Sequence, residues 1–87
     1  WTKNLGWVIA KMFTYNISKT ASSKEFKMAC SAIESKLKGI AKEDLITDVD
    51  GTQIQIYNTE DGRIKVCNDY EVDAVYADSD VNLSDIL

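Results

Sequence analysis

Two acidic residues, Asp48 and Asp50, have the types and spacing that phosphoryl-transfer chemistry uses. They lie in residues 45–52 (LITDVDGT), where an apolar stretch runs into Asp-x-Asp-Gly-Thr. Carboxylates can serve such chemistry as nucleophiles or beside a metal ion. Such a site requires a strand that delivers both carboxylates into one pocket.

This stretch resembles the first motif of the haloacid dehalogenase phosphatases, which implies a nucleophilic Asp48, an acid–base Asp50 and bound magnesium. That family spreads further Ser/Thr, Lys and acidic motifs over a large doubly wound α/β domain. Only 35 residues follow Thr52 here, and they alternate as antiparallel strands. Because Asp50-Gly51 is also a two-residue hairpin signal, we interpret the aspartates as turn residues. We assign no catalytic residue, cofactor or metal, and we expect a protein that is not an enzyme.

Other residue types narrow the chemistry further. The chain has no histidine, which excludes hydrolysis by a Ser-His-Asp triad, imidazole base catalysis and histidine-ligated zinc. Cys30 and Cys67 are too few and too far apart for a disulfide framework or a four-thiolate metal site. We expect reduced thiols in a cytoplasmic protein. The longest apolar run, residues 5–10, falls short of the roughly 20 residues of a membrane span.

Charge is sorted along the chain. Residues 1–47 carry eight lysines and four acidic residues, whereas residues 48–87 carry ten acidic and two basic residues, giving a net charge of −4. The late acidic residues could form a surface for a basic protein, or they could keep edge strands soluble. The possible basic-partner surface comprises Asp69, Glu71, Asp73, Asp78 and Asp80.

A row of lysines gives an alternative function. Lys24, Lys27 and Lys38 lie close together on one side of a predicted helix and could meet the phosphates of a nucleic acid. The row contains no arginine or stacking aromatic residue, and the chain has a pI of about 4.6. Nucleic acid is therefore disfavoured as a partner.

The elements that must position these residues begin with a strand at about residues 8–18 and a helix at about Ser23–Lys38. Ser22 and Glu25 have capping-box spacing, and Gly39 lies where a left-handed C-cap is needed. With a rotation of about 100° per residue, the apolar residues of the helix fall on one side. This predicted core face comprises Phe26, Ala29, Cys30, Ile33, Leu37 and Ile40.

Turn chemistry predicts the register of the remaining strands. A two-residue type I′ turn at Asp50-Gly51 places Val49 opposite Thr52 and Thr47 opposite Ile54. A type I turn with a glycine bulge at residues 59–62 places Ile56 opposite Val66 and Asn58 opposite Ile64. A third turn near residues 68–70 would pair Val66 with Val72 and Lys65 with Asp73. The buried side of this sheet would then include Leu45, Val49, Ile54 and Ile56.

These elements predict a single α+β domain over residues 1–87, in the order βαβββ(β). One amphipathic helix packs on one face of a mostly antiparallel four- or five-stranded sheet. Because the first methionine is Met12, we leave open whether residues 1–11 are added sequence or the cut end of a longer chain. The other sheet face is of mixed polarity, so we expect a partner to cover it. It would carry Met12, Thr14, Ile46, Gln53, Gln55, Tyr57, Lys65, Cys67, Asp73 and Val75.

The predicted function is a small protein-binding or regulatory domain that self-associates, as a dimer, through this face. The interface residues would be Met12, Tyr57 and Val75, with the acidic half of the chain directed toward a basic protein. No membrane partner is expected.

Overall fold

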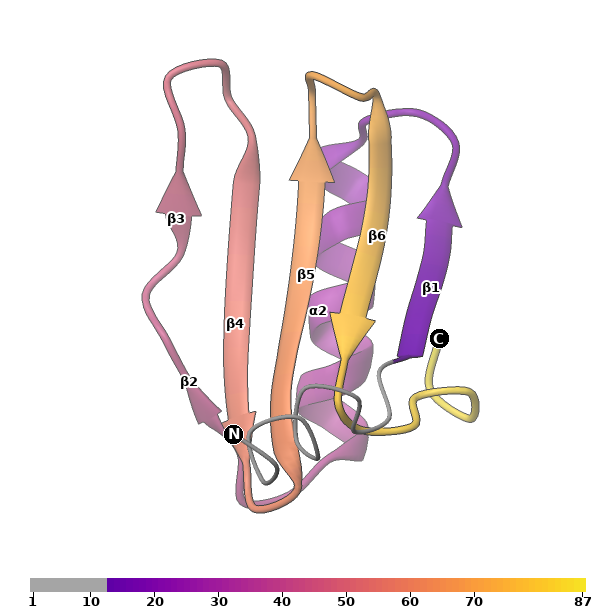
Figure 1. The fold of residues 1–87 in the computed structure, drawn as a ribbon, viewed down its shortest axis with the longest axis vertical. Helices are drawn as coiled ribbons and strands as arrows, with labels where there is room; N and C mark the ends of the chain where they lie inside the picture. Colours follow the sequence, from indigo (N-terminus) through magenta and orange to yellow (C-terminus); the bar gives the residue numbers. More distant parts are fainter. Residues whose placement is uncertain (1–12) are drawn as a thin grey trace, which may run out of the picture.

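The computed structural model describes residues 13–87, which form one helix and six strands (Figure 1). The predicted α+β class is confirmed, since one helix packs on a sheet whose neighbouring strands all pair antiparallel. Six strands are present rather than four or five, because the segment after the helix adds two strands of two residues each. Residues 8–12 of the predicted first strand lie outside the described residues. The elements are β1 (Phe13–Ser18), α2 (Ser23–Lys36), β2 (Ala41–Lys42), β3 (Ile46–Thr47), β4 (Gln53–Thr59), β5 (Gly62–Asp69) and β6 (Ala74–Ser79).

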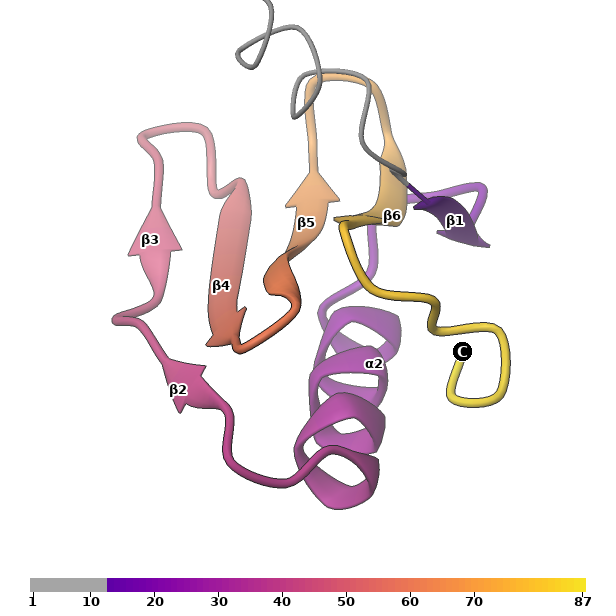
Figure 2. The ribbon, with the colours of Figure 1, turned by 60° about the horizontal axis from the view of Figure 1, so that its bottom comes forward.

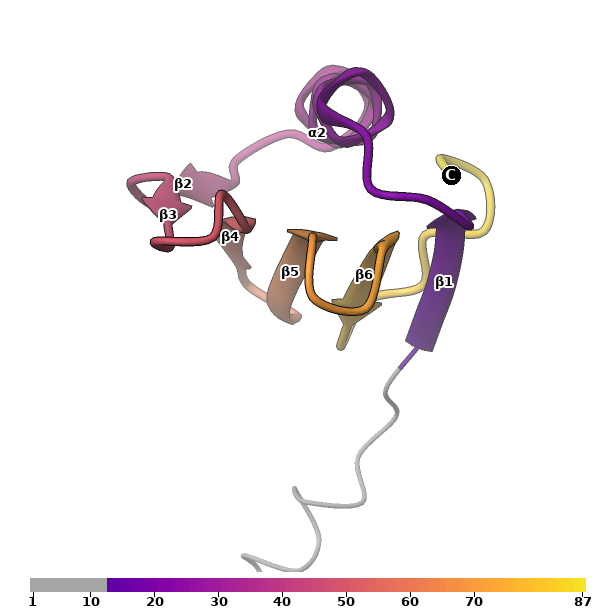
Figure 3. The same ribbon diagram turned by 90° about the horizontal axis from the view of Figure 1, so that it is seen from above.

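The strands lie in the order β1-β6-β5-β4-β2, and β3 also pairs with β4. β4, β5 and β6 form a meander, whereas β1 lies at the far edge beside β6. α2 lies across one side of the sheet, over β5 and β6, and β2 and β3 curl toward that same side (Figures 2 and 3). No described element covers the opposite side, which we call the open face.

α2 begins where the sequence predicts and ends two residues early. The Ser22 side chain caps the helix by accepting a hydrogen bond from the Glu25 N–H at 3.2 Å. The last helical residue is Lys36, so Lys38 lies beyond the helix. Gly39 nevertheless adopts the predicted left-handed conformation, with φ of 70°.

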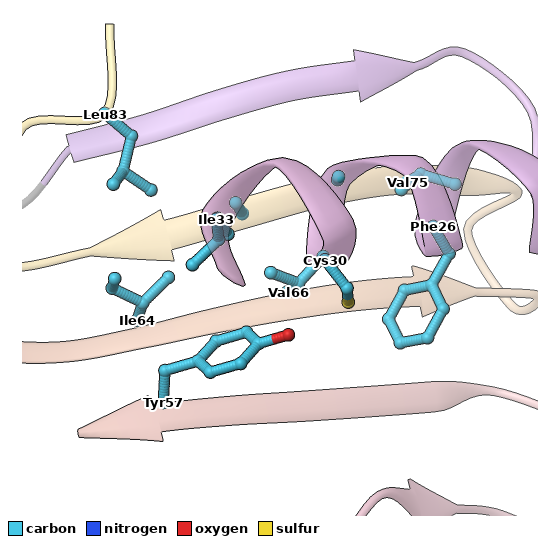
Figure 4. Close-up of a cluster of buried hydrophobic side chains, with 10 residues drawn as sticks. Phe26, Cys30, Ile33, Tyr57, Ile64, Val66, Val75 and Leu83 are labelled. Carbon is cyan, nitrogen blue, oxygen red and sulfur yellow. The ribbon is translucent and has the colours of Figure 1, made fainter. Parts of the chain in front are cut away.

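The hydrophobic core fills the space between α2 and the sheet (Figure 4). The helix contributes the predicted buried residues Phe26, Ala29, Cys30 and Ile33, while Leu37 and Ile40 pack against them partly buried. Leu83 closes one end of the core from the C-terminal segment. The sheet contributes Tyr57, Ile64, Val66, Val75 and Ala77.

The first hairpin turn is at the predicted place but has a longer loop. The Asp48 N–H donates to the Thr52 carbonyl at 2.9 Å, which leaves a three-residue loop at 49–51. Gly51 ends this loop with φ of 91°. Ile46 rather than Thr47 therefore lies opposite Ile54. Asp-Gly suits both loop lengths, because glycine adopts positive φ in either.

The loop of the second hairpin, between β4 and β5, is shorter than predicted. Thr59 pairs directly with Gly62 across a two-residue loop, without the predicted bulge. Val66 consequently lies opposite Gln55, and Ile56 lies opposite Lys65.

Together the two changes invert β4 relative to the prediction, since a one-residue slip moves every side chain to the other face. Gln55 and Tyr57 point toward α2 and are buried, while Ile54 and Ile56 lie on the open face. Leu45 and Val49, predicted to be buried, are exposed, and Val49 reaches 103% of its reference area.

The third turn lies further along the chain than predicted. Asp69 pairs with Ala74, so the loop covers residues 70–73, and Lys65 lies opposite Asp78 rather than Asp73. Asp73 takes the left-handed conformation with φ of 56°. Its carboxylate accepts a hydrogen bond from the Ala21 N–H at 2.8 Å, which holds the loop against the segment before α2. Aspartate tolerates this conformation better than most residues.

Candidate functional site

The open face carries the side chains that alternate away from α2. Ile46 lies opposite Ile54, Ile54 opposite Cys67 and Cys67 opposite Tyr76, so these residues form one line across four strands. We call Ile46, Ile54, Cys67 and Tyr76 the apolar row. Ile46 is 48% exposed, Ile54 and Tyr76 are half-buried, and Cys67 is buried. The middle of the open face is therefore largely apolar.

A second line of side chains crosses the open face beside the apolar row. Ile56 lies opposite Lys65, Lys65 opposite Asp78 and Asp78 opposite Thr14. The Thr14 hydroxyl donates to Asp78 Oδ1 at 3.0 Å. This hydrogen bond ties the edge strand β1 to β6.

A shallow hollow of about 230 Å³ lies at this end of the open face. Its basic side chains come from β5, and its acidic side chains come from β6 and the residue that follows it. The Arg63 backbone N–H donates to Asp80 Oδ2 at 3.1 Å, and the Arg63 guanidinium lies 3.5 Å from Glu43 Oε2. The hollow is lined by Ile56, Arg63, Lys65, Asp78, Ser79 and Asp80.

The Tyr76 hydroxyl stays protonated on this face. A hydrogen bond with the Cys67 side chain and partial burial both raise the pKa of Tyr76 well above its ordinary value. Tyr76 can therefore contribute its ring and a neutral hydroxyl group to a contact. It is not a nucleophile at neutral pH.

Two of the three predicted interface residues do not lie on the open face. Tyr57 and Val75 are both 0% exposed and belong to the core beneath α2. The prediction for Tyr57 is wrong because β4 is shifted by one residue, and that for Val75 because the third turn is displaced. Met12 lies outside the described residues. Ile46, Lys65 and Cys67 do lie on the predicted face.

Tyr57 joins the sheet to the helix. Its hydroxyl donates to Glu34 Oε2 at 2.5 Å, and the same oxygen lies 3.0 Å from Lys42 Nζ. The Tyr57 hydrogen bond and the Lys42 ammonium lower the pKa of Glu34, whereas burial and the Glu34 carboxylate raise the pKa of Tyr57. Burial likewise raises the pKa of the neighbouring Cys30 thiol. These pKa shifts are those of a fixed structural contact, in which a neutral phenol donates to an ionised carboxylate.

Asp48 and Asp50 act locally within the first hairpin turn. Asp48 Oδ1 accepts from the Val49 N–H at 2.7 Å, and Asp50 Oδ1 accepts from the Thr52 N–H at 3.0 Å. Hydrogen bonds from Thr52 lower the pKa of Asp50. The strand that precedes them is the two-residue antiparallel β3, not a parallel strand with a pocket at its end. Within residues 13–87, no group of three or more acidic or cysteine side chains is placed to hold a metal ion.

The acidic residues of the possible basic-partner surface occupy two separate places. Asp69, Glu71 and Asp73 lie at the β5–β6 turn, where Asp69 Oδ1 accepts the Glu71 N–H at 2.9 Å. Asp78 and Asp80 come later on β6 and just after it, roughly 17–23 Å from Asp73 along an extended strand. They form two acidic groups. The second borders the open face, and in the first group Asp69 lies on the same side of β5 as Cys67, where its charge acts on Tyr76.

The lysine row is shorter than the sequence suggests. Lys24 and Lys27 are exposed on the outer side of α2, where Met28 also faces solvent. Lys38 lies beyond the helix end and does not extend their row. Two lysines supply little positive charge for binding the phosphates of a nucleic acid.

Sequence reasoning overlooked the functional candidates Ile54, Ile56 and Tyr76. The alternation of Val75, Ala77 and Ser79 with Tyr76 and Asp78 was the signal that could have placed Tyr76 on the open face. No helix in the described part of the chain has the length and apolar character needed to cross a bilayer. Comparison with known proteins finds no matching family model, curated protein or solved structure.

Proposed function

We propose that this protein is a non-enzymatic protein-binding domain that holds its partner on the open face of the sheet. The observation that carries the proposal is the position of the apolar row, together with Ile56, on a face that no described element covers. Ile46 is exposed there, and Ile54, Ile56 and Tyr76 are half-buried. One-sided exposure is normal for antiparallel sheets, but the exposed side is then usually polar. A contiguous apolar patch with polar residues around it is typical of a surface that binds another macromolecule.

A protein fits this surface better than a small ligand or a polyanion. The hollow beside the apolar row, at about 230 Å³, is smaller than the roughly 300–1,000 Å³ of most small-molecule pockets. Its borders mix Arg63 and Lys65 with Asp78 and Asp80, so it has no single sign of charge to hold phosphates. At one end of the open face, the acidic residues at the β5–β6 turn favour contact with a basic surface on the partner.

The test compares two substitutions that introduce the same charge, one at a half-buried position on the open face and one at an exposed position on α2. Ile54→Glu places a carboxylate in the apolar row, and Met28→Glu places one on the outer side of α2, where Met28 is 56% exposed. We expect both variants to fold, as judged by circular dichroism and thermal unfolding. Ile54→Glu should lose at least about tenfold in affinity for any bound protein, itself included, because a buried unpaired carboxylate costs several kcal/mol.

Met28→Glu should bind as the unsubstituted protein does. The proposal is wrong if affinity capture and sedimentation reveal only contacts that are equally strong in the two variants.

A further inference from the structure

We propose that the partner on the open face is a second copy of this chain, packed sheet to sheet about a two-fold axis that runs along the strands between β5 and β6. This inference rests on the proposed function of the open face and adds the identity and orientation of the partner. It comes from the way in which charge is arranged on two neighbouring strands.

On the open face, β5 carries basic residues and β6 carries acidic residues at paired positions of the two strands. Lys65 on β5 lies opposite Asp78 on β6. Just beyond the end of β6, Asp80 continues the pattern beside Arg63: the Asp80 N–H donates to the Arg63 carbonyl at 3.0 Å, the Arg63 N–H donates to Asp80 Oδ2 at 3.1 Å, and both side chains line the hollow on the open face. The open face thus has a basic column, Lys65 and Arg63, directly beside an acidic column, Asp78 and Asp80.

A two-fold axis between these columns exchanges them. A copy rotated by 180° about that axis lays its β6 over β5 and its β5 over β6, at the same heights along the strands. Lys65 then faces the partner's Asp78 and Arg63 faces the partner's Asp80, and each pair occurs twice. Two-fold interfaces use one patch on both subunits, so the patch must complement itself in this way.

The other simple arrangement is electrostatically unfavourable. An axis that crosses the strands at right angles lays β5 on the partner's β5, which brings Lys65 and Arg63 against basic residues. Like charges set against each other suppress an orientation. The charge pattern therefore selects the axis along the strands, which also agrees with the aligned packing common between sheets.

Three residues of the apolar row, Ile54, Cys67 and Tyr76, lie on the overlapping strands and supply contact area beside the charged columns. The same rotation places Cys67 under the partner's Tyr76, whose hydroxyl stays neutral. With the axis between β5 and β6, four strands of each copy overlap (β4, β5, β6 and β1). Four strands about 4.8 Å apart and about six residues long give a face of roughly 19 by 20 Å. About 400 Å² per copy lies in the range of weak, transient interfaces, so we expect a rapidly reversible dimer that forms only at high protein concentration.

The closing experiment uses the full chain and two charge reversals, Lys65→Glu and Asp78→Lys. Sedimentation velocity over a wide range of protein concentration should show that each reversal raises the Kd at least about tenfold, because each sets like charges face to face across the axis. An equimolar mixture of the two variants should restore the dimer. In the mixed pair, the glutamate introduced by Lys65→Glu faces the lysine introduced by Asp78→Lys, and the unsubstituted Asp78 of the first variant faces the unsubstituted Lys65 of the second.

Recovery in the mixture cannot come from a repaired fold, since mixing changes neither chain. Lys27→Glu, a reversal on the outer side of α2, should leave the Kd unchanged. The inference is overturned if the unsubstituted chain is monomeric at every concentration, or if the mixture associates no better than the separate variants. If capture of a different protein remains sensitive to Ile54→Glu in either case, the homodimer is wrong and the proposed function of the open face stands.

Discussion

Replacing Tyr57 with phenylalanine tests the inverted register of β4 directly. In the structure Tyr57 is buried and its hydroxyl donates to Glu34 Oε2 at 2.5 Å. In the register predicted from the turns, the same side chain would face away from α2 and have no such acceptor. Tyr57→Phe removes one oxygen, keeps the ring in the core and so reports on this hydrogen bond.

The expected loss of unfolding free energy follows from the groups that contact the Tyr57 hydroxyl and its acceptor. A hydrogen bond to a charged group contributes roughly 1.5–3 kcal/mol. The Glu34 side chain is 39% exposed and also pairs with Lys42, so water can replace part of the lost bond. We therefore expect Tyr57→Phe to lower the free energy of unfolding by about 1–2 kcal/mol at neutral pH. With an m value of about 1 kcal/mol per molar urea, the unfolding midpoint falls by about 1–2 M.

The loss should depend on pH with a defined sign. The Tyr57 hydrogen bond lowers the pKa of Glu34 in the folded protein, below its ordinary value of about 4.3 in the unfolded chain. A lowered folded-state pKa contributes stability that is complete above the unfolded value and is lost as pH falls through the folded value. The difference between Tyr57→Phe and the unsubstituted protein should therefore shrink below about pH 4, as Glu34 is protonated.

Urea unfolding followed by fluorescence at several pH values measures this difference. Tyr70→Phe is the matched control, because Tyr70 is 44% exposed and its hydroxyl lies 3.5 Å from the Ser23 hydroxyl and from Asn68 Nδ2. It should change stability by less than about 0.5 kcal/mol. Equal stability of Tyr57→Phe and the unsubstituted protein, or a difference that does not vary with pH, would refute the buried position of Tyr57.

Two further pairs of substitutions, each a test with its control, examine the packing that positions the open face. Ile33→Ala should lower the free energy of unfolding by about 2–5 kcal/mol, because Ile33 is fully buried beneath α2, whereas Met28→Ala on the same helix should change it by less than about 0.5 kcal/mol; similar losses for both would contradict the assigned face of α2. Gly62→Ala should be more destabilising than Gly39→Ala in urea unfolding, since a Cβ at Gly62 would lie 2.4 Å from the Asp80 Cβ, while one at Gly39 meets nothing within 4 Å. Equal losses at the two glycines would mean that the second hairpin does not close beside Asp80.

The helix was predictable because its signals are local. Ser22, Glu25 and the spacing of Phe26, Cys30 and Ile33 each depend on neighbours within one or two turns, and these signals agree. The Ser22 cap and the buried side of the helix are found as predicted. The Glu25 half of the capping box is replaced, because the Ser22 N–H donates to Asn68 Oδ1. Only the helix end was placed too late, at Lys38, because the path of the chain toward β2 depends on tertiary contacts that the local pattern does not contain.

The sheet was predictable in its class and not in its register. An Asp-Gly pair fits a two-residue or a three-residue loop, and the difference of one residue decides whether Ile54 or Gln55 points inward. Apolarity alone favoured Ile54 and Ile56 as core residues. The structure instead buries Tyr57, whose ring fills the space beneath α2 while its hydroxyl reaches Glu34, and Gln55, whose side-chain amide donates to the Glu43 carbonyl.

This choice of side chains links the fold to the proposed function. Burying Tyr57 and Gln55 is compatible with folding because each has a polar partner, so their hydrogen-bonding groups are not left unsatisfied. The same register places Ile54 and Ile56 outward, where they have no role in the core. Two isoleucines on the outward side of a central strand add little to folding, yet they provide contact area for a second molecule. The polar core partners of β4 and the apolar open face are therefore two consequences of one register.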